Sequence, residues 1–183
     1  MRFIFSMLLV LLFLTSCSKR NSLADDLACS KFINLGETKT KSDFNKNFTV
    51  DLPLHWKKQG YFDDLQSSVQ AADTIKQLSE TYILDISYKY GEIEMDDSII
   101  EQINKESNLT VLQSNFEPFI DLPSYWQISK GEKNGYTYHL FQQFSKSSNK
   151  GYLEISLEIY GGNLVDERLC EALAVINTIE FTK

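Results

Sequence analysis

Strict alternation of apolar and polar side chains recurs along this sequence and limits the folds that it can adopt. The clearest stretch is residues 81–90, and residues 136–144 and 152–160 show the same two-residue period. Successive side chains of a β-strand point to opposite faces, so this period predicts strands with one face turned toward a core. Such strands require a sheet that buries one face under other elements.

Further strands and two helices complete the predicted fold. Residues 47–52 also alternate, and Pro53 ends this strand because proline cannot donate a hydrogen bond to the ladder. The other predicted elements are strands over 109–116 and 178–181 and helices over 97–107 and 164–176. Short polar loops between successive strands favour hairpins. The predicted class is therefore α+β, a mainly antiparallel sheet covered by one or two helices.

The first seventeen residues have the pattern of an export signal. Arg2 precedes an apolar run over residues 3–14, which is too short to cross a bilayer as a stable helix. The run ends in Leu-Thr-Ser-Cys, which resembles the bacterial lipobox, and the resemblance implies cleavage before Cys17 and attachment of lipid to its thiol. An uncleaved anchor helix and an ordinary signal with an incidental cysteine are the alternatives.

The lipobox divides the chain into three parts. Residues 1–16 are the predicted signal peptide, residues 17–30 the lipidated cysteine and a polar tether, and residues 31–183 a single domain. Mature lipoproteins usually carry three acyl chains, palmitate among them, and several chains hold a protein stably on a membrane. Ser18 stands where aspartate would retain a lipoprotein at the inner membrane. We therefore expect the periplasmic face of the outer membrane.

The net charge of −7 bears on the partners of the chain. Proteins that bind nucleic acid need a basic footprint, and the longest basic cluster of the predicted domain is Lys57-Lys58. We expect no nucleic-acid partner. The expected partners are the membrane, through the lipid anchor, and a protein of the cell envelope.

The three cysteines carry a second prediction about location. If Cys17 is lipidated, Cys29 and Cys170 remain as an even pair in an oxidising compartment. Such a pair is a candidate disulfide that would join the start of the domain to its last helix. Two buried free thiols are the alternative, because cysteine also packs as a small apolar residue.

A strand that ends in Leu-Pro, with tryptophan a few residues later, is similar to the opening of PsbP-like proteins. The residues that carry this resemblance are Phe48, Val50, Leu52, Pro53 and Trp56, and the terminal helix followed by residues 177–181 is similar to the way such chains end. The resemblance covers residues 45–182 and implies a PsbP-like sandwich, as in DcrB-type lipoproteins. It implies non-catalytic association as the common theme and assigns no functional residue.

Residues with catalytic or metal-binding chemistry are sparse. His55 and His139 are far apart in the sequence, and the acidic cluster of residues 92–97 does not have the spacing of a calcium-binding loop. The sequence contains no Gly-x-Ser-x-Gly elbow and no glycine-rich phosphate loop. We expect neither a metal nor a cofactor, and no catalytic residue is assigned.

Three functional hypotheses follow. The first is a membrane-anchored, non-catalytic binding or accessory lipoprotein of the cell envelope. The second is a carrier of a small ligand, and the third is an envelope hydrolase that uses carboxylates or His139 in a cleft. Tyr82, Tyr88 and Tyr90 share one strand face, which becomes an exposed aromatic interface if no helix covers it. The aromatic candidates to line a groove are Trp56, Tyr61, Phe62, Tyr125 and Trp126.

Overall fold

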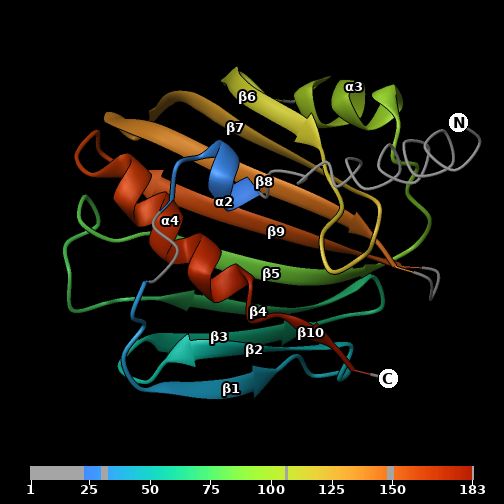
Figure 1. Cartoon of the computed structure of the whole chain (residues 1–183), viewed down its shortest axis with the longest axis horizontal. Helices are drawn as coiled ribbons and strands as arrows, with labels where there is room; N and C mark the ends of the chain where they lie inside the picture. The colour runs from blue at the N-terminus through green and yellow to red at the C-terminus, as the bar shows by residue number, and fades with distance from the viewer. Residues whose placement is uncertain (1–22, 30–32, 106, 148–150, 183) are drawn as a thin grey trace, which may run out of the picture.

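The computed structural model describes residues 23–29, 33–105, 107–147 and 151–182 (Figure 1). A seven-stranded sheet has the order β3 (Lys57–Phe62), β4 (Gln66–Ala72), β5 (Ile83–Tyr90), β9 (Gly151–Tyr160), β8 (Tyr136–Lys146), β7 (Ser124–Lys133) and β6 (Thr110–Phe116). A three-stranded sheet has the order β1 (Thr38–Ser42), β2 (Phe48–Pro53) and β10 (Glu180–Phe181). The helices are α2 (Leu23–Asp26), α3 (Asp97–Lys105) and α4 (Val165–Ile176). All strand pairs in both sheets are antiparallel, as predicted.

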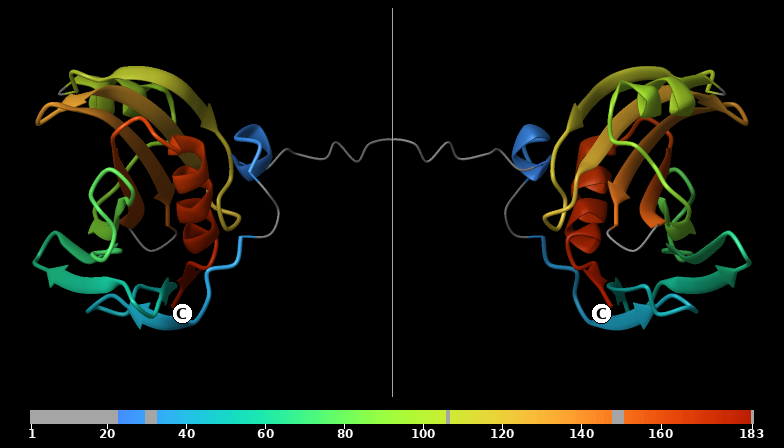
Figure 2. Two further views of the ribbon diagram at one scale, coloured as in Figure 1. Left: turned by 90° about the vertical axis from the view of Figure 1, so that its left-hand side faces the viewer. Right: turned by 90° about the vertical axis from the view of Figure 1, so that its right-hand side faces the viewer.

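Helix α4 lies in the hollow of the large sheet and beside the small one. Figure 2 shows the seven-stranded sheet curving around α4, with the small sheet closing the lower side. The helix packs against β9 and β2, and one buried apolar cluster joins the helix to both sheets. The alternating positions of β5 and β9 supply much of this core: Leu84, Ile86, Leu153, Ile155 and Leu157. Burial of this shared apolar surface is the main force that holds the layers together.

Arg168 fixes the start of α4 to the large sheet. Its side chain is 5% exposed, and its guanidinium donates hydrogen bonds to the carbonyl oxygens of Thr81 at 2.9 Å and Tyr160 at 2.8 Å. It also donates to the carbonyl oxygen of Asn163 at 2.6 Å. Burial lowers the pKa of Arg168, yet the group stays charged because arginine titrates far above neutral pH. The residue therefore satisfies backbone groups where a helix and two strands meet.

The opposite, outer face of the large sheet is covered only in part. Helix α3 packs on β7 and β8 through Ile99, Tyr125 and Phe144, which form a second buried cluster. Tyr125 and Trp126 are consecutive on β7, so they belong to different clusters on the two faces. Strand β7 therefore has both faces buried in its first half, whereas β4, β5 and β9 expose polar side chains on the outer face.

The strands predicted from alternation and both predicted helices are present, and the α+β class is confirmed. Strands β1, β3, β4 and β7 were not predicted, and β4 and β7 show two different physical reasons. The first six residues of β7 are all buried, so no polar face marks the strand. Strand β4 buries Ser67 and Ser68 beside Val69, and small polar residues conceal the period.

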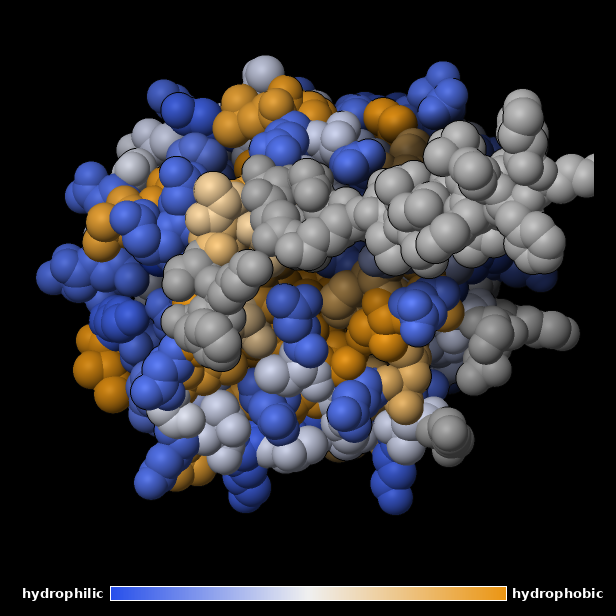
Figure 3. All heavy atoms as spheres, in the orientation of Figure 1, coloured by the Kyte–Doolittle hydropathy of each residue, from blue (hydrophilic) through white to orange (hydrophobic). Residues whose placement is uncertain are grey.

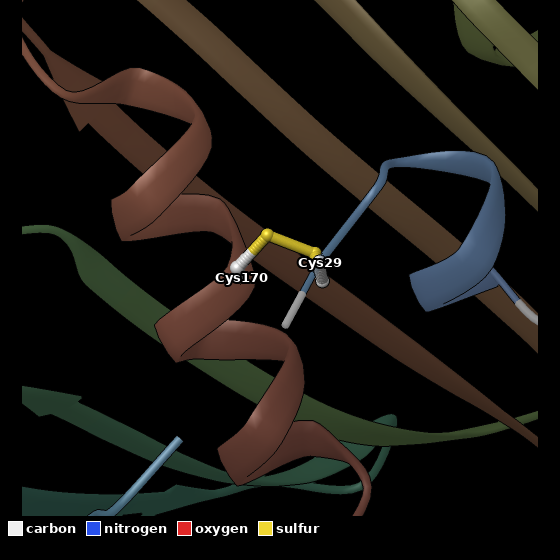
Figure 4. The surroundings of a disulfide bond; sticks show 2 residues. All are labelled: Cys29 and Cys170. Atoms are coloured by element: carbon white, nitrogen blue, oxygen red, sulfur yellow. A yellow bond between two sulfur atoms is a disulfide. The ribbon is translucent and has the colours of Figure 1, made fainter. Parts of the chain in front are cut away.

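The segment before residue 30 differs from the prediction of a free tether. Leu23, Leu27 and Cys29 pack against the main core, and Cys29 is joined to Cys170 of α4 by a disulfide of 2.02 Å (Figure 4). Residues 23–29 therefore belong to the folded domain, because their apolar side chains pack on its core. Cys17 and the predicted signal peptide lie outside the described residues. Within the described part of the chain, no helix has the length and apolar character needed to cross a membrane.

The predicted aromatic interface on β5 is wrong for two of its three residues. Tyr82 is 2% exposed and Tyr88 is 3% exposed, because their face of the strand is the core face. Tyr90 is 41% exposed at the strand end, where its hydroxyl accepts hydrogen bonds from the side-chain amides of Asn45 and Asn47. A continuous aromatic surface does not form there.

Removal of the disulfide should lower the free energy of unfolding. Cys29 and Cys170 are separated by 141 positions, and replacing both by serine should cost about 2–5 kcal/mol, since the unfolded chain regains the freedom of that loop. Urea unfolding followed by tryptophan fluorescence measures the difference. A reductant should lower the midpoint of the original protein and leave the double variant unchanged. Equal midpoints for the two oxidised proteins would contradict the prediction.

Candidate functional site, a cavity beside the N-terminal segment

A cavity of about 250 Å³ opens between α2, the connection from β6 to β7, and α4. We call it the α2 cavity. It lies on the face of the molecule that Figure 3 shows, where apolar side chains reach the surface among polar ones. Its floor is the hollow face of the large sheet. The lining residues are Leu23, Ala24, Glu117, Pro118, Phe119, Ile120, Trp126, Gln143, Leu173, Ile176 and Asn177.

The lining of the α2 cavity is mostly apolar, with a small number of polar groups. Trp126 is 1% exposed, and its indole nitrogen donates a 3.4 Å hydrogen bond to a carboxylate oxygen of Glu117. Gln143 is 2% exposed; its amide nitrogen donates to the hydroxyl of Ser145 at 3.4 Å, and its amide oxygen is buried without a partner. A buried acceptor without a donor is costly, so this carbonyl is a polar point in a mostly apolar wall that water or a ligand can satisfy.

The connection that borders the cavity holds a strained turn. Phe119 and Leu122 exchange backbone hydrogen bonds of 3.0 and 2.9 Å around Ile120 and Asp121. Both central residues have positive φ, 49° and 60°, which is the pattern of a type I′ turn. Asparagine and glycine favour this conformation, whereas a β-branched isoleucine is rare in it. Strain of this kind is concentrated where backbone is held for ligand contact.

A second, polar hollow of about 340 Å³ lies on the outer face of β4, β5 and β9. We call it the outer groove. Gln70 donates to a carboxylate oxygen of Asp85 at 2.6 Å, and the Ser87 hydroxyl donates to the other oxygen at 2.8 Å. Lys89 pairs with Glu154 at 2.5 Å, and Lys133 pairs with Glu158 at 3.1 Å. The charges of this groove are therefore largely compensated by their neighbours.

The two histidines lie apart from both hollows. His139 is on β8, 8% exposed, with a buried Nδ1 that has no partner. Burial lowers the pKa of His139, and the nearby cations Lys130 and Arg168 lower it further, against a smaller opposing effect of Asp166. The Nε2 atom of His55 lies 3.4 Å from a carboxylate oxygen of Asp73. Among the residues that the structure describes, no three His, Cys, Asp or Glu side chains are grouped to hold a metal ion.

Three of the aromatic residues proposed from the sequence to line a groove lie in the α2 cavity, the outer groove and the main core. Trp126 lines the α2 cavity, Tyr61 lines the outer groove, and Trp56 is in the main core. Gln143 was missed because it shares its strand face with Thr137, His139 and Phe141, so the sequence does not mark that face as the buried one. Leu23 and Ala24 were missed because the segment before residue 30 was taken as a tether.

Solved structures share this fold at low sequence identity. The Ran-binding protein Mog1p of Saccharomyces cerevisiae has a TM-score of 0.56 at 8% identity, over 79% of this chain and 95% of that chain. Cyanobacterial PsbP from Synechocystis has a TM-score of 0.56 at 10% identity, over 84% of this chain and 98% of that chain. A Pseudomonas aeruginosa protein of unknown function has a TM-score of 0.53 at 15% identity, over 81% of this chain and 99% of that chain.

These likenesses establish a Mog1/PsbP-like fold, as the PsbP-like motif had implied. No protein-family model and no curated protein sequence matches the chain. At these identities the shared property is the fold, and the site has to be argued from the residues of this chain.

Replacing Ile120 by asparagine should stabilise the free protein. Asparagine adopts positive φ at lower cost than a β-branched residue, so we expect a gain of about 1 kcal/mol in the free energy of unfolding. Thermal unfolding followed by circular dichroism measures the change. Ile120→Val is the matched control, because valine keeps the branched Cβ and should give no gain. A loss of stability in Ile120→Asn would show that the turn is not strained.

Lowering the pH should destabilise the fold through His139. Because burial lowers the pKa of His139, the unfolded chain, with its ordinary value of 6.5, takes up a proton at a higher pH than the folded protein. Unfolding then binds a proton, so the free energy of unfolding falls as the pH drops through 6.5 toward the lower folded value. Urea unfolding at successive pH values measures this slope. His139→Gln should flatten the slope, and an unchanged slope in this variant would contradict the prediction.

Proposed function

We propose that this chain is a lipid-anchored, non-catalytic binding lipoprotein of the cell envelope, held at the periplasmic face of the outer membrane, whose binding site is the α2 cavity. The observation that carries the proposal is an apolar cavity that contains Gln143, whose amide oxygen lacks a hydrogen-bond donor. Binding sites typically combine apolar walls with a few placed polar groups. The α2 cavity has this composition.

Two independent features support the proposed location. The Leu-Thr-Ser-Cys sequence at residues 14–17 matches the requirements for cleavage and lipid attachment at Cys17. The disulfide between Cys29 and Cys170 is typical of proteins that fold outside the reducing cytosol. Both features favour an exported protein whose fold is completed in the envelope.

An accessory role through a protein partner is the second candidate function. The outer groove favours it, because this part of the sheet face is polar and no helix of the described chain covers it. Mog1p, which shares the fold, is named for binding another protein. A partner that docks on the outer groove would leave the α2 cavity free, so the two functions are compatible.

Expression of a tagged chain in its native host tests the proposed function. We expect the original protein to fractionate with outer membranes, to carry acyl chains at Cys17, and to show a bound small molecule by native mass spectrometry. Cys17→Ala should lose the acyl chains, and Ala24→Phe, which fills the α2 cavity, should lose the small molecule. Ile75→Phe is the matched control, because Ile75 is 80% exposed and does not line the cavity.

Three results would separate the alternatives. An unmodified Cys17 in the membrane fraction would contradict the anchor. An empty cavity together with a stoichiometric crosslinked protein would favour the accessory role. Turnover of an envelope substrate that is abolished by His139→Ala would favour the hydrolase and contradict a non-catalytic function.

A further inference from the structure

We infer that the α2 cavity takes the end of an acyl chain, presented to it from the membrane on which the protein is anchored. This inference rests on the proposed function and names the ligand class of the same site. The arguments are the size of the cavity, the chemistry of its lining, and its position next to the start of the folded chain.

The size of the cavity fits part of a ligand. Its volume is about 250 Å³. Pockets that enclose a drug-sized molecule usually measure about 300–1,000 Å³, whereas a cavity of about 150 Å³ holds benzene. The α2 cavity is therefore large enough for the end of a hydrocarbon chain and too small for a whole lipid.

The lining places apolar groups around the cavity together with a few polar ones. Leu173 and Ile176 of α4 meet Phe119 of the β6–β7 connection, and Trp126 lies on the sheet side. Burial of hydrocarbon against such side chains is favourable without any directional contact. Gln143 and Asn177 are the amide side chains of this lining, and the methyl end of an acyl chain makes no hydrogen bond to either. No lysine, arginine or histidine lies among the described lining residues, so the lining offers no cation for a bound headgroup.

The position of the cavity supplies the argument for a membrane source. Leu23 lines the cavity and follows Cys17 by six residues. Six residues span at most about 20 Å when fully extended, so the lipid on Cys17 would lie within that distance of the cavity. Acyl chains are the abundant apolar groups at a membrane surface. The anchor thus holds the cavity beside a high local concentration of its ligand.

The disulfide holds the α2 side of the cavity in place. Cys29 bonds to Cys170, and the segment from Leu23 to Cys29 packs on the core, so α2 remains beside α4. The β6–β7 connection on the other side carries the strained residues Ile120 and Asp121. The α2 segment, which is held by the disulfide, and the β6–β7 connection, which carries the strained turn, border the cavity on two sides. We infer that the chain end enters between them.

The two tryptophans of the chain permit a direct test. Trp126 lines the cavity and Trp56 does not, so Trp56→Phe leaves a single reporter at the site. The mature chain carrying Cys17→Ala is secreted behind a cleavable signal and retains every described residue. A fatty acid brominated near its methyl end is then added below its micelle concentration. We expect most of the Trp126 fluorescence to be lost, because bromine quenches indole on contact.

Matched variants make the test specific. Trp126→Phe, which leaves only Trp56, should show little quenching. Adding Ala24→Phe to the Trp126 reporter should raise the half-quenching concentration by about tenfold or more, whereas Ile75→Phe should leave it unchanged. Absence of quenching at Trp126, or equal quenching of both tryptophans, would overturn the inference. A non-acyl molecule found by native mass spectrometry would also overturn it and would leave the proposed function standing.

The lipidated protein distinguishes two sources of the chain. If an acyl chain on Cys17 itself occupies the cavity, the lipidated Trp126 reporter should resist quenching by the added acid, while the Cys17→Ala form is quenched. If a separate membrane lipid is the ligand, both forms should be quenched at similar concentrations. Either result supports an acyl chain in the α2 cavity.

Discussion

The packing of α4 into the hollow of the large sheet is the interaction on which the rest of the structure depends. Leu169, Leu173 and Ile176 place this helix in the same buried cluster as both sheets. Arg168 ties its first turn to Thr81 and Tyr160, and Cys170 ties it to the N-terminal segment. Since one helix serves the core, the disulfide and the cavity, the cavity wall shares the rigidity of the core.

In the proposed function, the N-terminal segment joins the predicted lipid anchor at Cys17 to the candidate site. If residues 17–30 formed a free tether, the domain would sample a wide range of distances and orientations relative to the lipid. The packing of Leu23 and Leu27 and the bond at Cys29 instead place residues 23–29 on the folded domain. The same segment supplies part of the cavity wall. If the proposed function holds, anchoring and binding are linked by one short stretch of chain.

The two faces of the large sheet have different chemistry and suit different ligands. The hollow face is apolar, and the α2 cavity is the place where its cover is incomplete. The outer face carries carboxylates that are paired with lysines of other strands: Lys89 of β5 pairs with Glu154 of the adjacent β9, and Lys133 of β7 pairs with Glu158 of β9 across β8. Exposed pairs of this kind add little stability and leave a polar surface of low net charge. An apolar ligand would therefore bind in the α2 cavity, and a polar partner would bind on the outer face.

The sequence by itself determined the strands with clear alternation, both longer helices and the antiparallel α+β class, because periodicity records which side of an element is buried. It could not reveal β7, where both faces are covered, and it left the pairing of Cys29 with Cys170 open. The cavity was decided only by the tertiary structure. Leu23, Trp126 and Leu173 are far apart in the chain, and a cavity is space left between packed elements, which no local pattern of residues encodes.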